Sequence, residues 1–329
     1  MKKWGSLDVA GRAGQHRKPA KAGCGQNWPP HSAGALSTLS RGLSRLAVLT
    51  ALCTLLLVVA GALVTSNDAS LAIADWPLNW GKLVPPMEGG IRYAFAHRVA
   101  AATVAVLVVI LAAWQQSREP RAWVRRLGWA AVSTVLAQAA LGGAMVRFID
   151  PKSLSIAHAC LAQICFGLTV AIVVAQLPSL PTPASASSGL APTLAAAALF
   201  LQTILGAAVR HGAMTAVPHI AGAIVATALA MWAGLQVLMH HMENAPLRRA
   251  ATLLLALTFL QVFLGLAAYA SLAATAGDPQ PMPVMIWATV AHVAAGSLAF
   301  GAAIALAMRI YRHDKPTRPD LARGGMAVA

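Results

Sequence analysis

Eight long apolar stretches interrupt this sequence of 329 residues and constrain its fold more than any other feature. A helix needs about 20 apolar residues to cross a bilayer, and each stretch is long enough to do so. The length of the stretches and their lack of period-two alternation favour helices over strands. We therefore predict an all-α integral membrane protein. The predicted spans are Leu46–Thr65, Ile91–Trp114, Leu127–Val146, Ser153–Leu177, Leu190–Val209, Gly212–Met239, Ala250–Ala276 and Met282–Met308.

Composition excludes the main alternatives to a membrane protein. Hydrophobic residues make up 58% of the chain and charged residues 11%, whereas soluble domains average about 45–50% and about 25%. A soluble protein of this size would expose large apolar patches. The same figures exclude intrinsic disorder, and four cysteines are too few for a disulfide-rich scaffold.

The net charge of +15 would suit a nucleic-acid-binding protein, but the distribution of the charges excludes that class. Nineteen of the 25 lysines and arginines lie in the two tails and in the loops after the second and sixth predicted spans. The positive-inside rule therefore places both termini in the cytoplasm. The N-terminal tail is not the Ser-rich, amphipathic type of a transit peptide, which favours a bacterial plasma membrane.

A repeat is visible within the hydrophobic pattern. Each even-numbered span carries one histidine near its outer end, and the spacings are 61, 61 and 73 residues. Three odd-numbered spans share the pattern Gln-x-x-x-Gly, and the first span keeps only the glycine, Gly61. The histidines are His97, His158, His219 and His292, and the Gln/Gly pairs are Gln138/Gly142, Gln202/Gly206 and Gln261/Gly265.

Repetition of a helical hairpin predicts two repeated four-helix bundles. We expect the first bundle at 46–177 and the second at 190–312. A Pro/Ser/Ala-rich linker at 178–189 would join them. Basic tails at 1–45 and 313–329 complete the chain, and the first of them has the composition of a disordered segment resting on anionic lipid.

Four histidines at matching depth are more informative than one. An ionisable side chain inside a membrane is costly and usually functional, although a neutral imidazole can also simply bond a neighbouring helix. Zinc is a poor fit, because no cysteine or carboxylate shares their depth. Imidazoles paired across a bundle are suited to the two axial positions of haem iron. We therefore pair His97 with His158, and His219 with His292, as ligands of two haem irons.

Arginines at the same end of the spans fit two haem sites. Guanidinium groups at the rim would suit haem propionates, with snorkelling to lipid headgroups as the plain alternative. The candidates are Arg98, Arg147 and Arg210. The three repeated glutamines are expected to form hydrogen bonds between helices rather than to bind a ligand.

These features together resemble the heme A synthase family. The resemblance rests on eight spans, four histidines in this order, and the segments HR at 97–98, DWPLNWG at 75–81, LGAAVRHG at 205–212 and PHIAG at 218–222. It covers about residues 46–312. It implies oxidation of the C8 methyl group of heme O to a formyl group, which gives heme A for cytochrome oxidase assembly. It also implies that His97 and His158 flank the substrate haem and that His219 and His292 ligate a haem b cofactor.

Two departures from the family pattern affect these expectations. The family usually carries a glutamate with a catalytic role three residues before the first histidine, but this chain has Ala94 there. Glu88 and Asp75 are the nearest acidic residues, and neither is an obvious substitute. Many members also have a pair of outer-loop cysteines, and here Ile73 and Asn79 occupy those positions.

Other functions remain open at this point. The chain could be a haem-binding assembly factor without catalysis, a diheme electron-transfer protein, or a transporter with repeated halves. Expected partners are heme O and heme A, heme O synthase, the cytochrome oxidase assembly machinery and the lipid bilayer. A homo-oligomer is left open.

Overall fold

All the regular structure in the described part of the chain is helical. The computed structural model describes residues 31–178 and 189–313, and no strand occurs among them. Residues 39–313 lie in one compact unit, while residues 31–38 belong to a separate N-terminal unit. The helices are α1 (His31–Ser66), α2 (Ile91–Arg118), α3 (Ala122–Arg147), α4 (Lys152–Gln176), α5 (Leu190–Arg210), α6 (Ala216–His240), α7 (Ala245–Ala274) and α8 (Pro283–His313).

Each of these helices is long and apolar enough to cross a membrane. The prediction of an all-α, multi-pass membrane protein with eight spans is therefore confirmed. Several helix boundaries differ from the sequence expectation. Helix α1 begins at His31 and not at Leu46, so residues 31–45 of the expected tail are helical, and α7 begins at Ala245 and not at Ala250. Helix α6 begins at Ala216 and not at Gly212. Gly212 has a φ of +64° and lies in the turn that follows α5, where a helix cannot yet begin.

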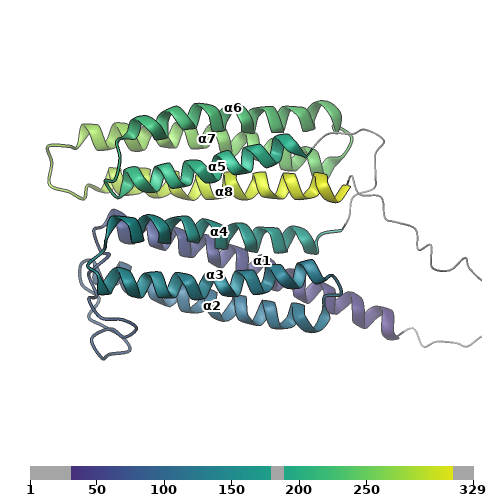
Figure 1. Ribbon diagram of the computed structural model, residues 1–329, viewed down its shortest axis with the longest axis horizontal. Coiled ribbons are helices and arrows are strands. Elements are labelled where there is room, and N and C mark those ends of the chain that lie inside the picture. Colours follow the sequence, from purple (N-terminus) through teal and green to yellow (C-terminus); the bar gives the residue numbers. More distant parts are fainter. Residues whose placement is uncertain (1–30, 179–188, 314–329) are drawn as a thin grey trace, which may run out of the picture. The chain divides into compact units, whose positions relative to one another are not determined.

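Two separate hydrophobic cores lie within the helical unit. Buried residues of α1, α2, α3 and α4, among them Ala47, Leu111 and Ile172, form one of them. Buried residues of α5, α6, α7 and α8, among them Leu254 and Leu306, form the other. Figure 1 shows the two corresponding groups of four helices. The internal repeat, and the domain boundaries drawn from it, stay predictions.

The predicted tails and linker fall mostly outside the described residues. The tail at 1–45 is described only from residue 31, and of the linker at 178–189 only its two end residues are described. Of the C-terminal tail at 313–329, only residue 313 is described.

Helices α4 and α8 join the two groups through matching residues. On α4, Gly167 lies against Phe300 of α8, and on α8, Gly301 lies against Phe166 of α4. Five residues after His158 and His292 come Gln163 and Ser297, which are 5% and 2% exposed. The amide nitrogen of Gln163 donates a hydrogen bond of 2.7 Å to the Ser297 hydroxyl. Equivalent positions of α4 and α8 therefore meet each other at this interface.

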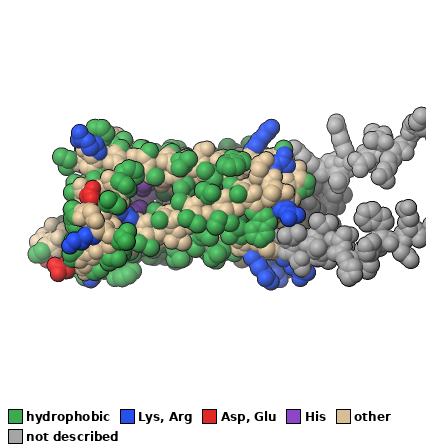
Figure 2. All heavy atoms as spheres, turned by 90° about the horizontal axis from the view of Figure 1, so that it is seen from below, with side chains coloured by type: hydrophobic (Ala, Val, Ile, Leu, Met, Phe, Trp, Pro, Cys, Tyr) green, Lys and Arg blue, Asp and Glu red, His purple; other side chains and the backbone are tan. Residues whose placement is uncertain are grey.

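Apolar side chains cover the long surfaces of the bundles, and charged side chains gather at the two ends (Figure 2). Many large apolar residues on these surfaces, such as Leu52, Leu136 and Phe263, are more than half exposed. This distribution suits a surface surrounded by lipid chains. We call the end that carries the four paired histidines the histidine end; its loops are residues 67–90, 148–151, 211–215 and 275–282.

At the other end, a buried carboxylate joins the α2–α3 turn to α4. Glu119 accepts two hydrogen bonds from the Arg121 guanidinium, at 2.7 and 2.9 Å. The amide of Gln176 donates a third, at 3.2 Å. The Arg121 hydrogen bond lowers the pKa of Glu119 more than burial raises it.

Candidate functional site: two histidine pairs

The structure brings the four histidines together as two pairs, one in each group of helices. The ring centroids of His97 (α2) and His158 (α4) are 6.4 Å apart, with 63° between the ring planes. Those of His219 (α6) and His292 (α8) are 6.1 Å apart, with the planes at 90°. Every one of these residues lies within the first three turns of its helix. We call them the first and the second histidine pair.

A glycine of the preceding helix lies against each histidine ring. A Cβ atom on Gly61, Gly206 or Gly265 would lie 3.2, 3.1 or 2.8 Å from Cε1 of His97, His219 or His292 respectively. The fourth glycine, Gly142, is less tightly packed, and its Cβ would lie 3.8 Å from Cε1 of His158. The glycines found in the sequence repeat therefore allow the rings to approach the neighbouring backbone.

The geometry of both pairs fits a metal ion between the two rings. An imidazole nitrogen binds a transition metal at about 2 Å. Two such bonds in line, together with the radius of each ring, span about 6 Å, which matches both centroid separations. The Nδ1 atoms of the four rings are buried, and backbone groups of the preceding helices, at Leu57, Gln202 and Gln261, interact with the rings of His97, His219 and His292. The described residues contain no cluster of three or more His, Cys, Asp or Glu that could hold a metal ion by themselves.

Both pairs are reached from outside. All four histidines are half-buried, so part of each side chain meets open space although Nδ1 does not. Figure 2 shows histidine side chains at the bottom of a hollow in one face, toward the end where acidic side chains gather. The two-histidine arrangement and this access fit a planar metal cofactor, such as haem, better than a closed metal site. The assignment of the histidines to haem iron stays a prediction.

The repeated glutamines surround these pairs with unpaired amide oxygens. The Oε1 atoms of Gln138, Gln202 and Gln261 are buried and have no hydrogen-bond partner among the described residues. The amide nitrogen of Gln261 lies 3.2 Å from Nε2 of His292. Gln261 thus makes the hydrogen-bond contact between helices that was expected of it, and its partner is one of the candidate ligands.

The three arginines occupy different environments. Arg98, next to His97 on α2, donates hydrogen bonds to the carbonyl oxygens of Leu78 and Ile73 and to Oδ1 of Asn79, at 2.8, 3.0 and 3.2 Å. It therefore fastens the loop 67–90 over the histidine end. The same loop places Trp76 against Gly143 of α3, where a Cβ atom would lie 3.1 Å from the indole.

Arg210 and Lys152 reach across from one group of helices to the other. Nη2 of Arg210, at the end of α5, donates to the Ser66 hydroxyl at 2.5 Å and to the Ala62 carbonyl at 3.2 Å, both on α1. In the opposite direction, Nζ of Lys152 on α4 donates to the carbonyl of Gly212 at 2.8 Å. The guanidinium of Arg147 lies 6.0 Å from the ring of the adjacent Phe148. The propionate-binding role of the three arginines stays a prediction.

Position 94 is an apolar site beside the first histidine pair. Ala94 lies three residues before His97 on α2, so both residues share a face of that helix. It is 7% exposed. Of the two acidic residues considered as substitutes, Glu88 is exposed in the loop, and Asp75 acts electrostatically on Arg98.

A further repeat in the sequence marks the surface where α4 and α8 meet. Residues 157–167 and 291–301 both read Ala-His followed, after seven residues, by Phe-Gly. These are the segments of α4 and α8 that meet at the interface between the two groups of helices. The motif therefore predicts the contact between α4 and α8 as well as one histidine of each pair.

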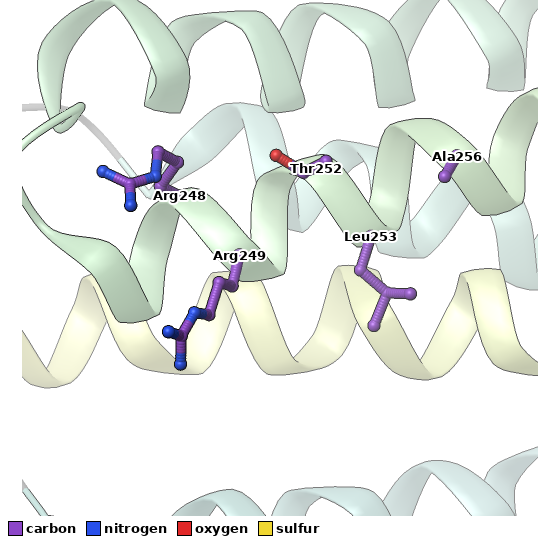
Figure 3. Close-up of a pocket in the computed structure, with 5 residues that line it drawn as sticks. All are labelled: Arg248, Arg249, Thr252, Leu253 and Ala256. Atoms are coloured by element: carbon purple, nitrogen blue, oxygen red, sulfur yellow. The ribbon is translucent and has the colours of Figure 1, made fainter.

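A shallow pocket elsewhere on the chain is unrelated to the histidines. It is lined by residues near the start of α7, and the two arginines precede the other lining residues along the helix (Figure 3). Gly265, which faces His292, lies 12 residues beyond Leu253 of this pocket, or about 18 Å further along the helix. The lining residues are Arg248, Arg249, Thr252, Leu253 and Ala256.

Comparison with known proteins gives a consistent result. The chain is 35% identical over 115 residues to a heme A synthase of Shouchella clausii. These residues make up 33% of this chain and 38% of that protein. It is 41% identical over 91 residues to a heme A synthase of Symbiobacterium thermophilum, 27% of this chain and 29% of that protein. With a heme A synthase of Maricaulis maris it shares 32% identity over 155 residues, 44% of this chain and 43% of that protein.

These matches are partial but agree with one another. Each of the three spans less than half of the relative's own length, and no family model matches the chain. Two further relatives, which are 31% and 32% identical to the chain, are also named heme A synthase. The five matches support the heme A synthase family as the family of this chain.

Proposed function

We propose that this protein is a heme A synthase, an oxidoreductase that converts the C8 methyl group of heme O to a formyl group. The observation that carries this proposal is the presence of two histidine pairs with separations of 6.4 and 6.1 Å. The proposed reaction needs one site for a substrate haem and a second site for a haem cofactor, and two histidine pairs would supply both. The partial similarity to heme A synthases supports the same function.

The first pair is assigned to the substrate and the second to the cofactor. His97 and His158 would bracket heme O, and His219 and His292 would ligate haem b. A bound haem b supplies a one-electron redox centre. The residues of the chain bind and orient both macrocycles, and Arg98, Arg147 and Arg210 are the proposed partners of their propionates.

The loop 67–90 lies beside the first pair. Arg98 fastens this loop beside His97 by three hydrogen bonds. Trp76 of the loop lies on Gly143, one residue after the glycine that faces His158. Limiting the access of water to a reacting centre suppresses side reactions. We infer that the loop serves the reaction in this way.

The proposed setting of the enzyme is a bacterial plasma membrane with both termini in the cytoplasm. The histidine end would then face outward. Heme O synthase would supply the substrate, and the cytochrome oxidase assembly machinery would receive the product.

Haem analysis of cells tests the function. The full chain is expressed with a heme O synthase in a host that makes no heme A, and extracted haems are separated by chromatography. We expect a heme A peak that disappears when His97 is replaced by Ala. Absence of heme A from cells in which the purified chain carries its haem would contradict the enzymatic assignment.

Ala94 favours a second candidate, a haem-binding assembly factor without catalysis. This position is buried, and its methyl side chain cannot itself stabilise developing positive charge as a carboxylate could. The Ala94→Glu variant separates the two candidates. If the wild-type chain makes no heme A and the variant does, the natural protein is a haem carrier that lacks one catalytic group.

A diheme electron carrier between the two membrane faces agrees less well with the structure. Both histidine pairs lie at the same end of the helices, within three turns of it. A path across the bilayer would need haems at both depths.

A further inference from the structure

Asp150 is an acidic residue that the sequence argument did not consider, and it lies next to the first histidine pair. It precedes the N-terminus of α4 in the left-handed conformation, with a φ of +51°. Its backbone N–H donates to the carbonyl of Met145 at 2.7 Å. The hydroxyl of the buried Ser155 donates to Oδ1 of its carboxylate. These contacts fix the position of the carboxylate.

The carboxylate lies on the face of α4 that carries His158. Ser155 and His158 are three residues apart on α4 and so share one face of the helix. The carboxylate is therefore bonded to a residue that lies about one helical turn before His158 on the same face. The ionisable groups that act electrostatically on His158 are His97, Asp150 and His211. For His292, in the second pair, the only such group among the described residues is His219.

His211 brings a group from the second bundle to the same place. It caps the C-terminus of α5 and is half-buried. Burial lowers the pKa of His211, while the Asp150 carboxylate raises it and Arg210 lowers it. The neighbouring hydrogen bond from Lys152 to the Gly212 carbonyl holds the two loops together.

The other acidic residues of the first bundle at the histidine end have different surroundings. Asp75 acts on Arg98, and Asp68 acts on Arg210. Glu88 is exposed. Asp150 is the acidic residue among the described ones that acts on a member of either histidine pair.

We propose that Asp150 is the carboxylate that serves the first histidine pair in place of an acidic side chain at position 94. This inference rests on the proposed function. A negative charge beside His158 stabilises positive charge that develops at the first pair during oxidation. Asp150 acts through His158 and is a positioning residue. Among the described residues, no carboxylate acts on His219 or His292, which would distinguish the substrate site from the cofactor site.

The first test measures the midpoint potentials of both haems in the purified full chain. The protein is prepared after co-expression with heme O synthase and titrated while its absorption spectrum is recorded. Removing a nearby negative charge destabilises the ferric state. Asp150→Asn should therefore make one potential more positive and leave the other unchanged. Glu88→Gln, the matched control, should change neither.

A second variant keeps this test decisive if Asp150→Asn folds poorly. Ser155→Ala retains the carboxylate but releases it from the helix, so the same haem should shift in the same direction by a smaller amount. If neither variant shifts a potential, or if both haems shift equally, the proposal is overturned.

The last test asks whether a glutamate at position 94 can replace the Asp150 carboxylate in heme A formation. Asp150→Asn should lower heme A formation at least 10-fold at unchanged haem content, and adding Ala94→Glu should restore it. If the Asp150→Asn variant converts heme O to heme A as completely as the wild-type chain, the proposal is overturned. If the wild-type chain binds haem but makes no heme A, the proposed function fails, and the potentials still decide whether Asp150 serves the first pair.

Discussion

Gly265 of α7 lies against the ring of His292 of α8, so closely that a Cβ atom on the glycine would stand 2.8 Å from Cε1 of the imidazole. No side chain larger than hydrogen fits there unless the ring moves. The equivalent pair in the first bundle, Gly142 and His158, would have an ordinary contact of 3.8 Å. The same glycine of the repeat thus restrains its histidine to different extents in the two bundles.

Alanine at these two glycines should therefore have unequal effects. Gly265→Ala displaces His292 and should remove the haem of the second pair, so that the purified protein carries about half its haem. Gly142→Ala should retain full haem content. Pyridine haemochrome analysis per mole of protein measures both. Equal haem content in the two variants would contradict the conclusion that Gly265 restrains the His292 ring more tightly than Gly142 restrains the His158 ring.

Arg98 should control the order of the loop 67–90. Arg98→Ala removes three hydrogen bonds to that loop, each of which contributes about 1 kcal/mol. Amide hydrogen exchange in residues 70–90 should become faster in this variant. Arg92→Ala is the control, because the Arg92 guanidinium bonds its neighbour Tyr93 and not the loop. Unchanged exchange in the Arg98 variant would show that other contacts hold the loop.

The bond between Gln163 and Ser297 should contribute little to stability. Gln163 donates to Ser297, but its Oε1 atom is buried and unpaired among the described residues. Hydrogen bonds between membrane helices contribute about 0.6 kcal/mol on average. Removing the buried, unpaired amide oxygen is favourable and offsets the loss of the hydrogen bond. Gln163→Met should thus change the unfolding free energy by less than about 1 kcal/mol. Gly167→Val, which would clash with Phe300, should destabilise the chain clearly in the same detergent-unfolding assay.

Glu119 should make stability depend on pH in the acidic range. Its pKa is lowered in the folded protein, chiefly by the Arg121 hydrogen bond. The stabilisation is therefore complete above the ordinary carboxyl pKa and is lost as the pH falls through the lower, folded value. Because Arg121 is about one-third exposed, we expect about 1 kcal/mol or less at neutral pH.

Thermal unfolding in detergent between pH 3 and 7 checks this dependence. Glu119→Gln should lower the melting temperature at pH 7 and converge with the wild-type chain at the acidic end. Glu243→Gln, at an exposed site, should follow the wild-type curve throughout. A constant difference between Glu119→Gln and wild type at all pH values would mean that the carboxylate charge is not the cause.

The sequence by itself determined the class of fold and the residues that matter most. A helix across a bilayer must be about 20 apolar residues long, so eight spans could be counted directly. The recurrence of His97, His158, His219 and His292 followed from the same periodicity. Residue spacing indicated their common depth, because the rise per residue of a helix is fixed.

Only the tertiary structure decided which groups from different helices touch. Arg98 bonds the loop 67–90, Arg210 reaches α1, and Asp150 accepts a hydrogen bond from Ser155, one helical turn before His158. These contacts depend on loop conformation and on the rotation of each helix about its axis. Hydrophobic length does not encode either of them, because a lipid-facing residue and a bundle-facing residue can be equally apolar. The packing of α4 on α8 fixes those rotations and so defines the surroundings of each histidine pair.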